Sequence, residues 1–174
     1  MKETPPKHCR LNTAKWTAVS RAMRQALLTM GRKVCIFYFL TLVAHQDIKA
    51  SDDLAVRARF FGYLAAFLQS LYGHRSGVLT NMTVSEVLQA EGDETVGYVI
   101  NVNQHKTNRQ FGAAQIYLEP TEYRWMRTWV DLRKARAPQN NLFFTMTGKG
   151  PAKSLLPTFT DIRTAVSTYV RNLR

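Results

Sequence analysis

The chain has 174 residues, of which 45% are hydrophobic and 11% aromatic, enough to build a buried core and to exclude a globally disordered protein. Its 24 Lys and Arg residues outnumber its 12 Asp and Glu residues, so the formal net charge is +12 at pH 7. A balance this basic indicates a polyanionic partner, with nucleic acid the leading interpretation; a merely soluble basic protein and one that binds anionic membrane surfaces are the alternatives.

The basic residues concentrate in three stretches, and one short stretch is acidic. The basic stretches are Lys2–Lys49, Arg124–Arg136 and Lys149–Arg174, and the acidic one is Glu86–Glu94. Because basic positions alternate with apolar ones, we expect folded basic faces in place of a disordered tail.

The two cysteines, Cys9 and Cys35, are too few for a disulfide scaffold or a zinc site, so we expect reduced thiols in an intracellular protein. Nuclear and cytoplasmic locations both fit, with the nucleus favoured in a eukaryote. The apolar run at 34–44 is shorter than the roughly 20 residues that span a bilayer, and no signal-peptide pattern opens the chain. We therefore expect no secretion and no insertion into a membrane.

Residues 1–12 read as a flexible leader, and 13–50 as an N-terminal helical segment that packs on the main domain. Thr13 or Asn12 can cap a helix that ends at Gly31. Apolar residues follow helical spacing in this segment at Trp16, Val19, Met23, Ala26, Leu27 and Met30.

A second helix is predicted over Val34–His45, apolar on nearly every side and therefore buried. A strand is the alternative, because β-branched and aromatic residues crowd the run.

A long helix is predicted from Ser51–Asp53, where acidic residues suit a helix start, to Tyr72 and Gly73. Arg57 and Arg59 fall outside its apolar stripe. The stripe comprises Leu54, Ala58, Phe61, Leu64, Phe67, Leu68 and Leu71.

Two strands are predicted next, at Gly97–Val102 and Ala113–Leu118, joined by the long polar segment 103–112 into a hairpin. Pro120 begins another helix, in which Trp125 and Trp129 are predicted to be core residues and not base-stacking platforms.

Beyond this helix, 138–141 break the helical pattern, 142–144 form a short apolar piece, 148–151 form a basic loop, and a final helix starts near Thr160. The fold class is mainly α with a small antiparallel sheet (α+β).

Residues 71–87, Leu-Tyr-Gly-His-Arg-Ser-Gly-Val-Leu-Thr-Asn-Met-Thr-Val-Ser-Glu-Val, resemble the first arginine box of the tyrosine recombinase (phage integrase) family. The predicted hairpin then places Lys106 where that family has its hairpin lysine. The resemblance implies a recombinase catalytic-domain-like fold over 51–174, with ancestry in DNA recombination and integration. The His-x-x-Arg and tyrosine-nucleophile boxes are absent, so we expect a truncated domain: a fragment, or a domesticated remnant of a mobile element.

The resemblance implies that Arg75 would grip a scissile phosphate and that Lys106 would act as general acid. The alternatives are a helix-end arginine that caps carbonyls and a solvated hairpin tip. Val78 stands where the family usually has an acidic residue that orients the arginine. We therefore expect DNA binding without cleavage and rejoining through a phosphotyrosine, and Tyr169 is assigned to a core stripe.

The expected partner is double-stranded DNA, with RNA, a homo-oligomer or a protein partner left open. No cofactor or metal is expected, because His74 and His105 lack companion ligands at metal spacing. The competing function is a protein-interaction module. The candidate DNA-binding residues are His74, Arg75, Gln104, His105, Lys106, Asn108, Arg109, Lys149 and Lys153.

Overall fold

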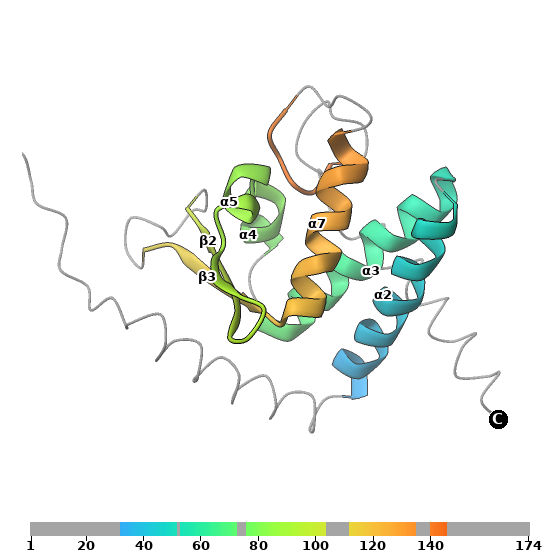
Figure 1. Cartoon of the computed structure of the whole chain (residues 1–174), viewed down its shortest axis with the longest axis horizontal. Helices are drawn as coiled ribbons and strands as arrows, with labels where there is room; N and C mark the ends of the chain where they lie inside the picture. Colours follow the sequence, from blue (N-terminus) through green and yellow to red (C-terminus); the bar gives the residue numbers. More distant parts are fainter. Residues whose placement is uncertain (1–31, 52, 73–75, 104–111, 135–139, 146–174) are drawn as a thin grey trace, which may run out of the picture.

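The computed structural model describes residues 32–51, 53–72, 76–103, 112–134 and 140–145 (Figure 1). The elements within these ranges are α2 (Arg32–Ala50), α3 (Leu54–Tyr72), α4 (Ser76–Asn81), α5 (Val84–Leu88), β1 (Glu91–Asp93), β2 (Gly97–Val102), β3 (Ala114–Leu118) and α7 (Pro120–Lys134). Helix α7 lies between the α2–α3 pair and the small sheet, and α4 and α5 lie beside the sheet (Figure 1). This arrangement confirms the α+β class. The helices predicted over 13–30 and from residue 160 lie outside the described residues, as does the basic loop at 148–151.

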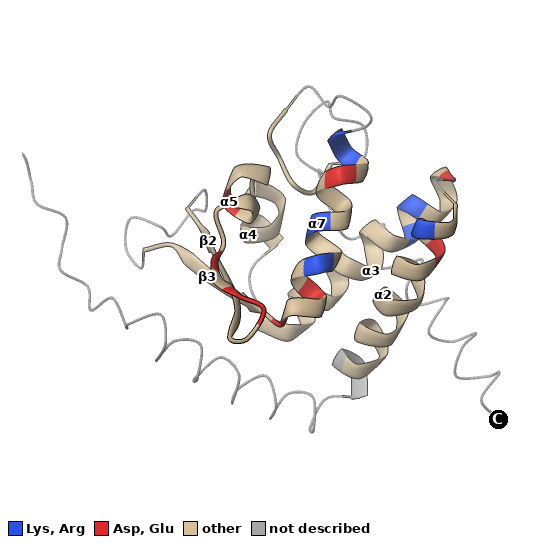
Figure 2. Ribbon diagram, viewed as in Figure 1, with Lys and Arg blue, Asp and Glu red and all other residues tan. Residues whose placement is uncertain are grey.

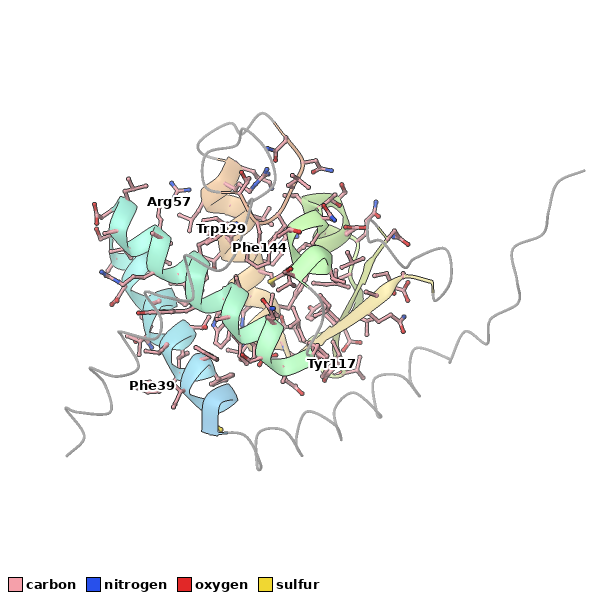
Figure 3. All side chains as sticks on the ribbon, turned by 180° about the vertical axis from the view of Figure 1, so that it is seen from behind. Phe39, Arg57, Tyr117, Trp129 and Phe144 are labelled. Carbon is pink, nitrogen blue, oxygen red and sulfur yellow. The ribbon has the colours of Figure 1, made fainter. Side chains whose placement is uncertain are left out.

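Helix α2 confirms the helical prediction, so the strand alternative is wrong. The expectation of burial on nearly every side is also wrong, because Phe39 is 42% exposed and Val43 is 39% exposed. The buried face consists of Thr41, Ala44, His45 and Ile48. One side of α2 packs against α3, with the Tyr38 ring 5.7 Å from that of Phe67, and Figure 3 shows Phe39 on the outer side of the helix. Apolar composition alone could not reveal which side of this helix packs into the core.

Helix α3 begins and ends close to its predicted bounds. Its start is stabilised by Asp53, whose carboxylate accepts the backbone N–H of Ala55 at 3.1 Å. The first turn of the predicted stripe is not core, however, because Leu54 is 63% exposed and Ala58 is exposed as well.

Arg57, predicted to fall outside the apolar stripe, is instead only 5% exposed. Its Nη2 donates to the carbonyl oxygen of Leu132 at 3.1 Å, and its guanidinium lies 5.9 Å from the ring centroid of Trp129. The last-turn carbonyls of a helix lack intrahelical donors, and an aromatic face attracts a cation. Arg57 therefore satisfies the C-terminal end of α7 from a neighbouring helix.

The sheet has the order β1-β2-β3 and is antiparallel throughout. The predicted hairpin is confirmed, with a register that runs from Tyr98↔Leu118 to Val102↔Ala114. Strand β1 was not predicted. It is three residues long, fully exposed and composed of Glu91, Gly92 and Asp93, so it carries none of the apolar alternation that indicates a strand. Its pairing with β2 is what makes it a strand.

Both tryptophans of α7 belong to the core, which confirms their assignment. The Trp125 ring lies 5.1 Å from that of Tyr38, and the Trp129 ring lies 5.4 Å from that of Phe61. Trp129 Nε1 donates to the carbonyl oxygen of Phe143 at 2.9 Å, which attaches the apolar piece at 142–144 to α7. Figure 3 shows Arg57, Trp129 and Phe144 on one side of the core. A single hydrophobic core therefore joins α2, α3, α7 and the sheet.

Among the described residues, no helix combines the length and the apolar character needed to cross a membrane.

Candidate nucleic-acid interface

All nine predicted site residues lie outside the described residues, in the segments 73–75, 104–111 and 146–174. Arg75 and Lys106 are among them, so their predicted roles stay predictions. The structure does describe the residues on both sides of the first two segments. These flanking residues define how each segment is attached to the fold.

The segment that carries Arg75 begins where α3 is tied to the sheet. Tyr72, the last residue of α3, donates its hydroxyl hydrogen to the backbone carbonyl of Tyr117 in β3. On the other side, Ser76 begins α4, whose Val78 and Leu79 are buried. The two ends of this three-residue segment are therefore held by the core.

The loop that carries Lys106 begins at a residue held by α5. Glu86 Oε1 accepts the backbone N–H of Asn103 at 2.7 Å, directly after β2. Its other oxygen, Oε2, accepts the Thr83 backbone N–H at 2.8 Å, and Thr83 Oγ1 accepts the Glu86 backbone N–H at 3.2 Å. These reciprocal bonds form a capping box that starts α5. The Glu86 carboxylate thus holds both the start of α5 and Asn103, the residue that follows β2.

The sequence analysis used Glu86 as the start of the acidic stretch and as part of the resemblance at 71–87, and it missed the structural role of this residue. The pattern Thr83-x-x-Glu86 is the signal that could have revealed the capping box. No local pattern indicates the bond to Asn103, which is 17 residues away.

The two attachment points lie on the same small sheet. Tyr117 pairs with Val99 in the β2–β3 register, and Asn103 follows four residues after Val99. At about 3.3 Å per strand residue, the two points are roughly 13 Å apart. The segments that carry Arg75 and Lys106 therefore start from neighbouring parts of one structural unit.

Charge is divided unevenly along the described fold. The described ranges contain nine of the 24 Lys and Arg residues and nine of the 12 Asp and Glu residues, so they are neutral in sum. All nine Lys and Arg residues belong to α2, α3 and α7, and Figure 2 colours those of α3 and α7 and the C-terminal part of α2 blue. The described residues between 76 and 122 carry no Lys or Arg and six acidic residues, namely Glu86, Glu91, Asp93, Glu94, Glu119 and Glu122. The net charge of +12 is therefore contributed by residues outside the described ranges.

A buried histidine lies where α2 meets α7. His45 Nε2 is 2.9 Å from Thr128 Oγ1, and Thr128 donates its hydroxyl hydrogen to the carbonyl of Arg124 at 3.0 Å. With its one hydrogen directed at Arg124, the Thr128 hydroxyl accepts from the Nε2–H of a neutral His45 ring. Burial, followed by the positive charges of Lys49 and Arg124, lowers the pKa of His45 to about 4.

Acidification is expected to destabilise the protein through His45. The pKa is lowered from 6.5 in the unfolded chain to about 4 in the folded one, so the unfolded state binds more protons as the pH falls through this window. The contribution of neutral His45 to the free energy of unfolding is complete above pH 6.5 and is lost as the pH falls toward 4. Between pH 7.5 and pH 5 we expect the free energy of unfolding, measured by urea denaturation, to fall by about 2 kcal/mol.

The variant His45→Gln is the control, because its amide can still donate to Thr128 but does not titrate. Its free energy of unfolding should change less over the same pH range. An identical pH dependence in both proteins would show that His45 is not the responsible group.

Among the residues that the structure describes, no group of three or more His, Cys, Asp or Glu side chains is placed to hold a metal ion. Comparison of the chain with protein families, curated proteins and solved structures finds no match.

Proposed function

We propose that the chain is a DNA-binding domain related to the tyrosine recombinases that lacks a complete recombinase active site. The observation that carries the proposal is the charge: 24 Lys and Arg residues face 12 Asp and Glu residues in the sequence, and the described cations all lie on α2, α3 and α7, with none between 76 and 122. Lys and Arg residues concentrated in this way suit a ligand with a phosphate backbone.

The order of the elements supports the relationship to recombinases. Helix α3 ends at Tyr72, directly before the segment with Arg75. The short helices α4 and α5 follow, and β2 and β3 then form an antiparallel pair on either side of the segment that contains Lys106. This is the order that the resemblance implies. The proposed roles are phosphate binding by Arg75 and contact with the DNA backbone by the loop around Lys106.

The surroundings of Val78 support the absence of catalysis. This residue occupies the position at which the family usually has an acid that orients the arginine, and its side chain is 6% exposed within the hydrophobic core. A valine there offers no acceptor for a guanidinium. Arg75 would therefore lack this support for the geometry that phosphoryl transfer requires.

The full chain is expected to bind duplex DNA with an affinity that depends strongly on salt. If about four phosphates are neutralised, raising the salt concentration from 50 to 200 mM should weaken binding about 100-fold, because counterions are released on binding. Fluorescence anisotropy with a labelled duplex measures this, and duplex RNA of the same length distinguishes the two nucleic acids. Absence of binding at 50 mM salt would refute the proposal.

A protein-interaction module is the second candidate, and the exposed apolar side chains of α2 favour it. Phe39 and Val43 lie one helical turn apart and are both substantially exposed. An apolar docking surface would respond weakly to salt, so the same titration series separates the two functions.

A further inference from the structure

We propose that DNA backbone phosphates contact a cationic face formed by α2 and α7, and that the duplex lies off the acidic β1–β2 side of the fold, which borders this face where Glu94 pairs with Arg124. We call this surface the α2–α7 face and define it by Lys49, Arg124, Arg127 and Lys134. The inference rests on the proposed DNA binding and specifies which part of the described surface takes part.

The outer side of α7 provides a row of cations. Arg124, Arg127 and Lys134 are exposed and recur at spacings of three and seven, which places them along one side of a helix. The opposite side holds the buried residues Trp125, Met126, Trp129, Val130 and Arg133. The row covers ten residue steps, about 15 Å at 1.5 Å per residue, which is long enough to follow several phosphates.

Lys49 extends this row onto α2. The hydrogen bond between His45 and Thr128 joins the two helices. Lys49 follows His45 by one helical turn, and Arg124 precedes Thr128 by one turn. Both positive charges act on the His45 ring, so both lie near the junction. The face therefore continues across two helices.

The cations of the α2–α7 face can bind phosphate with little loss of stability. Within the part of the chain that the structure describes, Lys49 and Arg127 form no ion pair. Arg124 lies 3.4 Å from Glu94, and Lys134 lies 3.7 Å from Asp131, in pairs whose side chains are largely exposed to solvent. Exposed ion pairs contribute little to stability and are easily exchanged.

The acidic side of the fold sets the orientation. Glu91, Asp93 and Glu94 are exposed on β1 and the turn that follows it, and Figure 2 shows acidic positions along this part of the sheet. A duplex placed against this side would face like charges, which disfavours that approach.

The test compares two charge removals in the full chain. The double variant Lys49→Gln/Arg127→Gln removes two cations from the α2–α7 face. The control, Arg59→Gln, removes one cation from α3, which packs against α2. Arg59 follows Arg57 by two residues, roughly 200° around α3, so it points away from α7. All three side chains are exposed, and the melting temperatures should stay near that of the wild type.

We expect the double variant to reduce the slope of log affinity against log salt by about 2 and to weaken binding about tenfold or more at low salt. Arg59→Gln should leave the slope nearly unchanged. If Arg59→Gln reduces the slope by as much per charge removed as the double variant does, then only the total charge of the protein matters, and the α2–α7 face is refuted.

If the double variant binds like the wild type while Arg75→Ala and Lys106→Ala weaken binding, the hairpin side holds the DNA. In that case this inference is wrong and the proposed function stands. A wild-type chain that does not bind DNA at all removes the proposed function and this inference with it.

Discussion

Replacement of Gly97 by alanine is expected to lower the free energy of unfolding by about 3 kcal/mol or more. Gly97 has φ +83, a conformation that L side chains rarely adopt. A Cβ atom there would lie 2.6 Å from the hydroxyl of Tyr117 and 2.8 Å from the backbone oxygen of Leu118. The Leu118 oxygen belongs to the strand that pairs with β2, so it cannot move away without disturbing the hairpin. Chemical denaturation followed by circular dichroism measures the loss.

Two other glycines provide matched controls. Gly112 also has a positive φ, +76, but a Cβ there meets no atom within 4 Å, so Gly112→Ala should cost only the backbone strain of about 1 kcal/mol. Gly77 lies in α4, again with nothing within 4 Å, and Gly77→Ala should be neutral or slightly stabilising. Equal losses for Gly97→Ala and Gly112→Ala would mean that the close approach of Tyr117 and Leu118 is unimportant.

Replacement of Trp129 by alanine is expected to cost about 4 kcal/mol or more of unfolding free energy. The ring contacts Phe60 and Phe61, with centroid distances of 6.2 and 5.4 Å, and the Arg57 guanidinium lies beside it. Truncation would leave a large cavity between α3 and α7, and it would remove the donor to the buried carbonyl of Phe143. Urea denaturation of the wild type and the variant measures the difference.

A pair of phenylalanine substitutions separates the hydrogen bond from the packing. Among the residues that the structure describes, buried Trp125 Nε1 has no hydrogen-bond partner, whereas Trp129 Nε1 donates to Phe143. Trp129→Phe should therefore cost about 1 kcal/mol more than Trp125→Phe, because only the former removes a buried hydrogen bond, and the Phe143 carbonyl keeps its bond from the Thr145 backbone N–H at 3.2 Å. Similar costs for both variants would indicate that packing alone accounts for the effect of Trp129.

The proposed contacts of the loop around Lys106 are compatible with the acidic side of the sheet. The exposed acids of the β1–β2 turn lie at the Gly97 end of β2, and the loop leaves from the Val102 end. Six strand residues separate the two ends, roughly 17–20 Å. This distance exceeds the Debye length at physiological salt, so Asp93 and Glu94 should not neutralise the cations of the loop. Glu91 and Glu86 lie closer to it, because they accept hydrogen bonds from Asn101 and Asn103.

Local signals in the sequence were sufficient for the elements that begin or end at distinctive residues. Acidic residues before Leu54 predicted the start of α3, Pro120 predicted the start of α7, and apolar strands around a polar segment predicted the β2–β3 pair. Each of these signals acts on backbone geometry or helix capping within a few residues, so it can be read without knowledge of the fold. The burial of both tryptophans followed from their helical spacing.

The sequence by itself therefore determined the class of fold, the approximate bounds of α3, β2 and β3, the start of α7, and a net charge of +12. Only the tertiary structure decided that β1 is a strand, that Arg57 is buried against Trp129, and that Glu86 holds the exit of β2. The physical reason is that each of these features depends on a partner distant along the chain, such as the Leu132 carbonyl, 75 residues from Arg57. The same reason explains why sequence reasoning did not assemble Lys49 and Arg124 into one face: two helices far apart in the chain must pack before their charges meet.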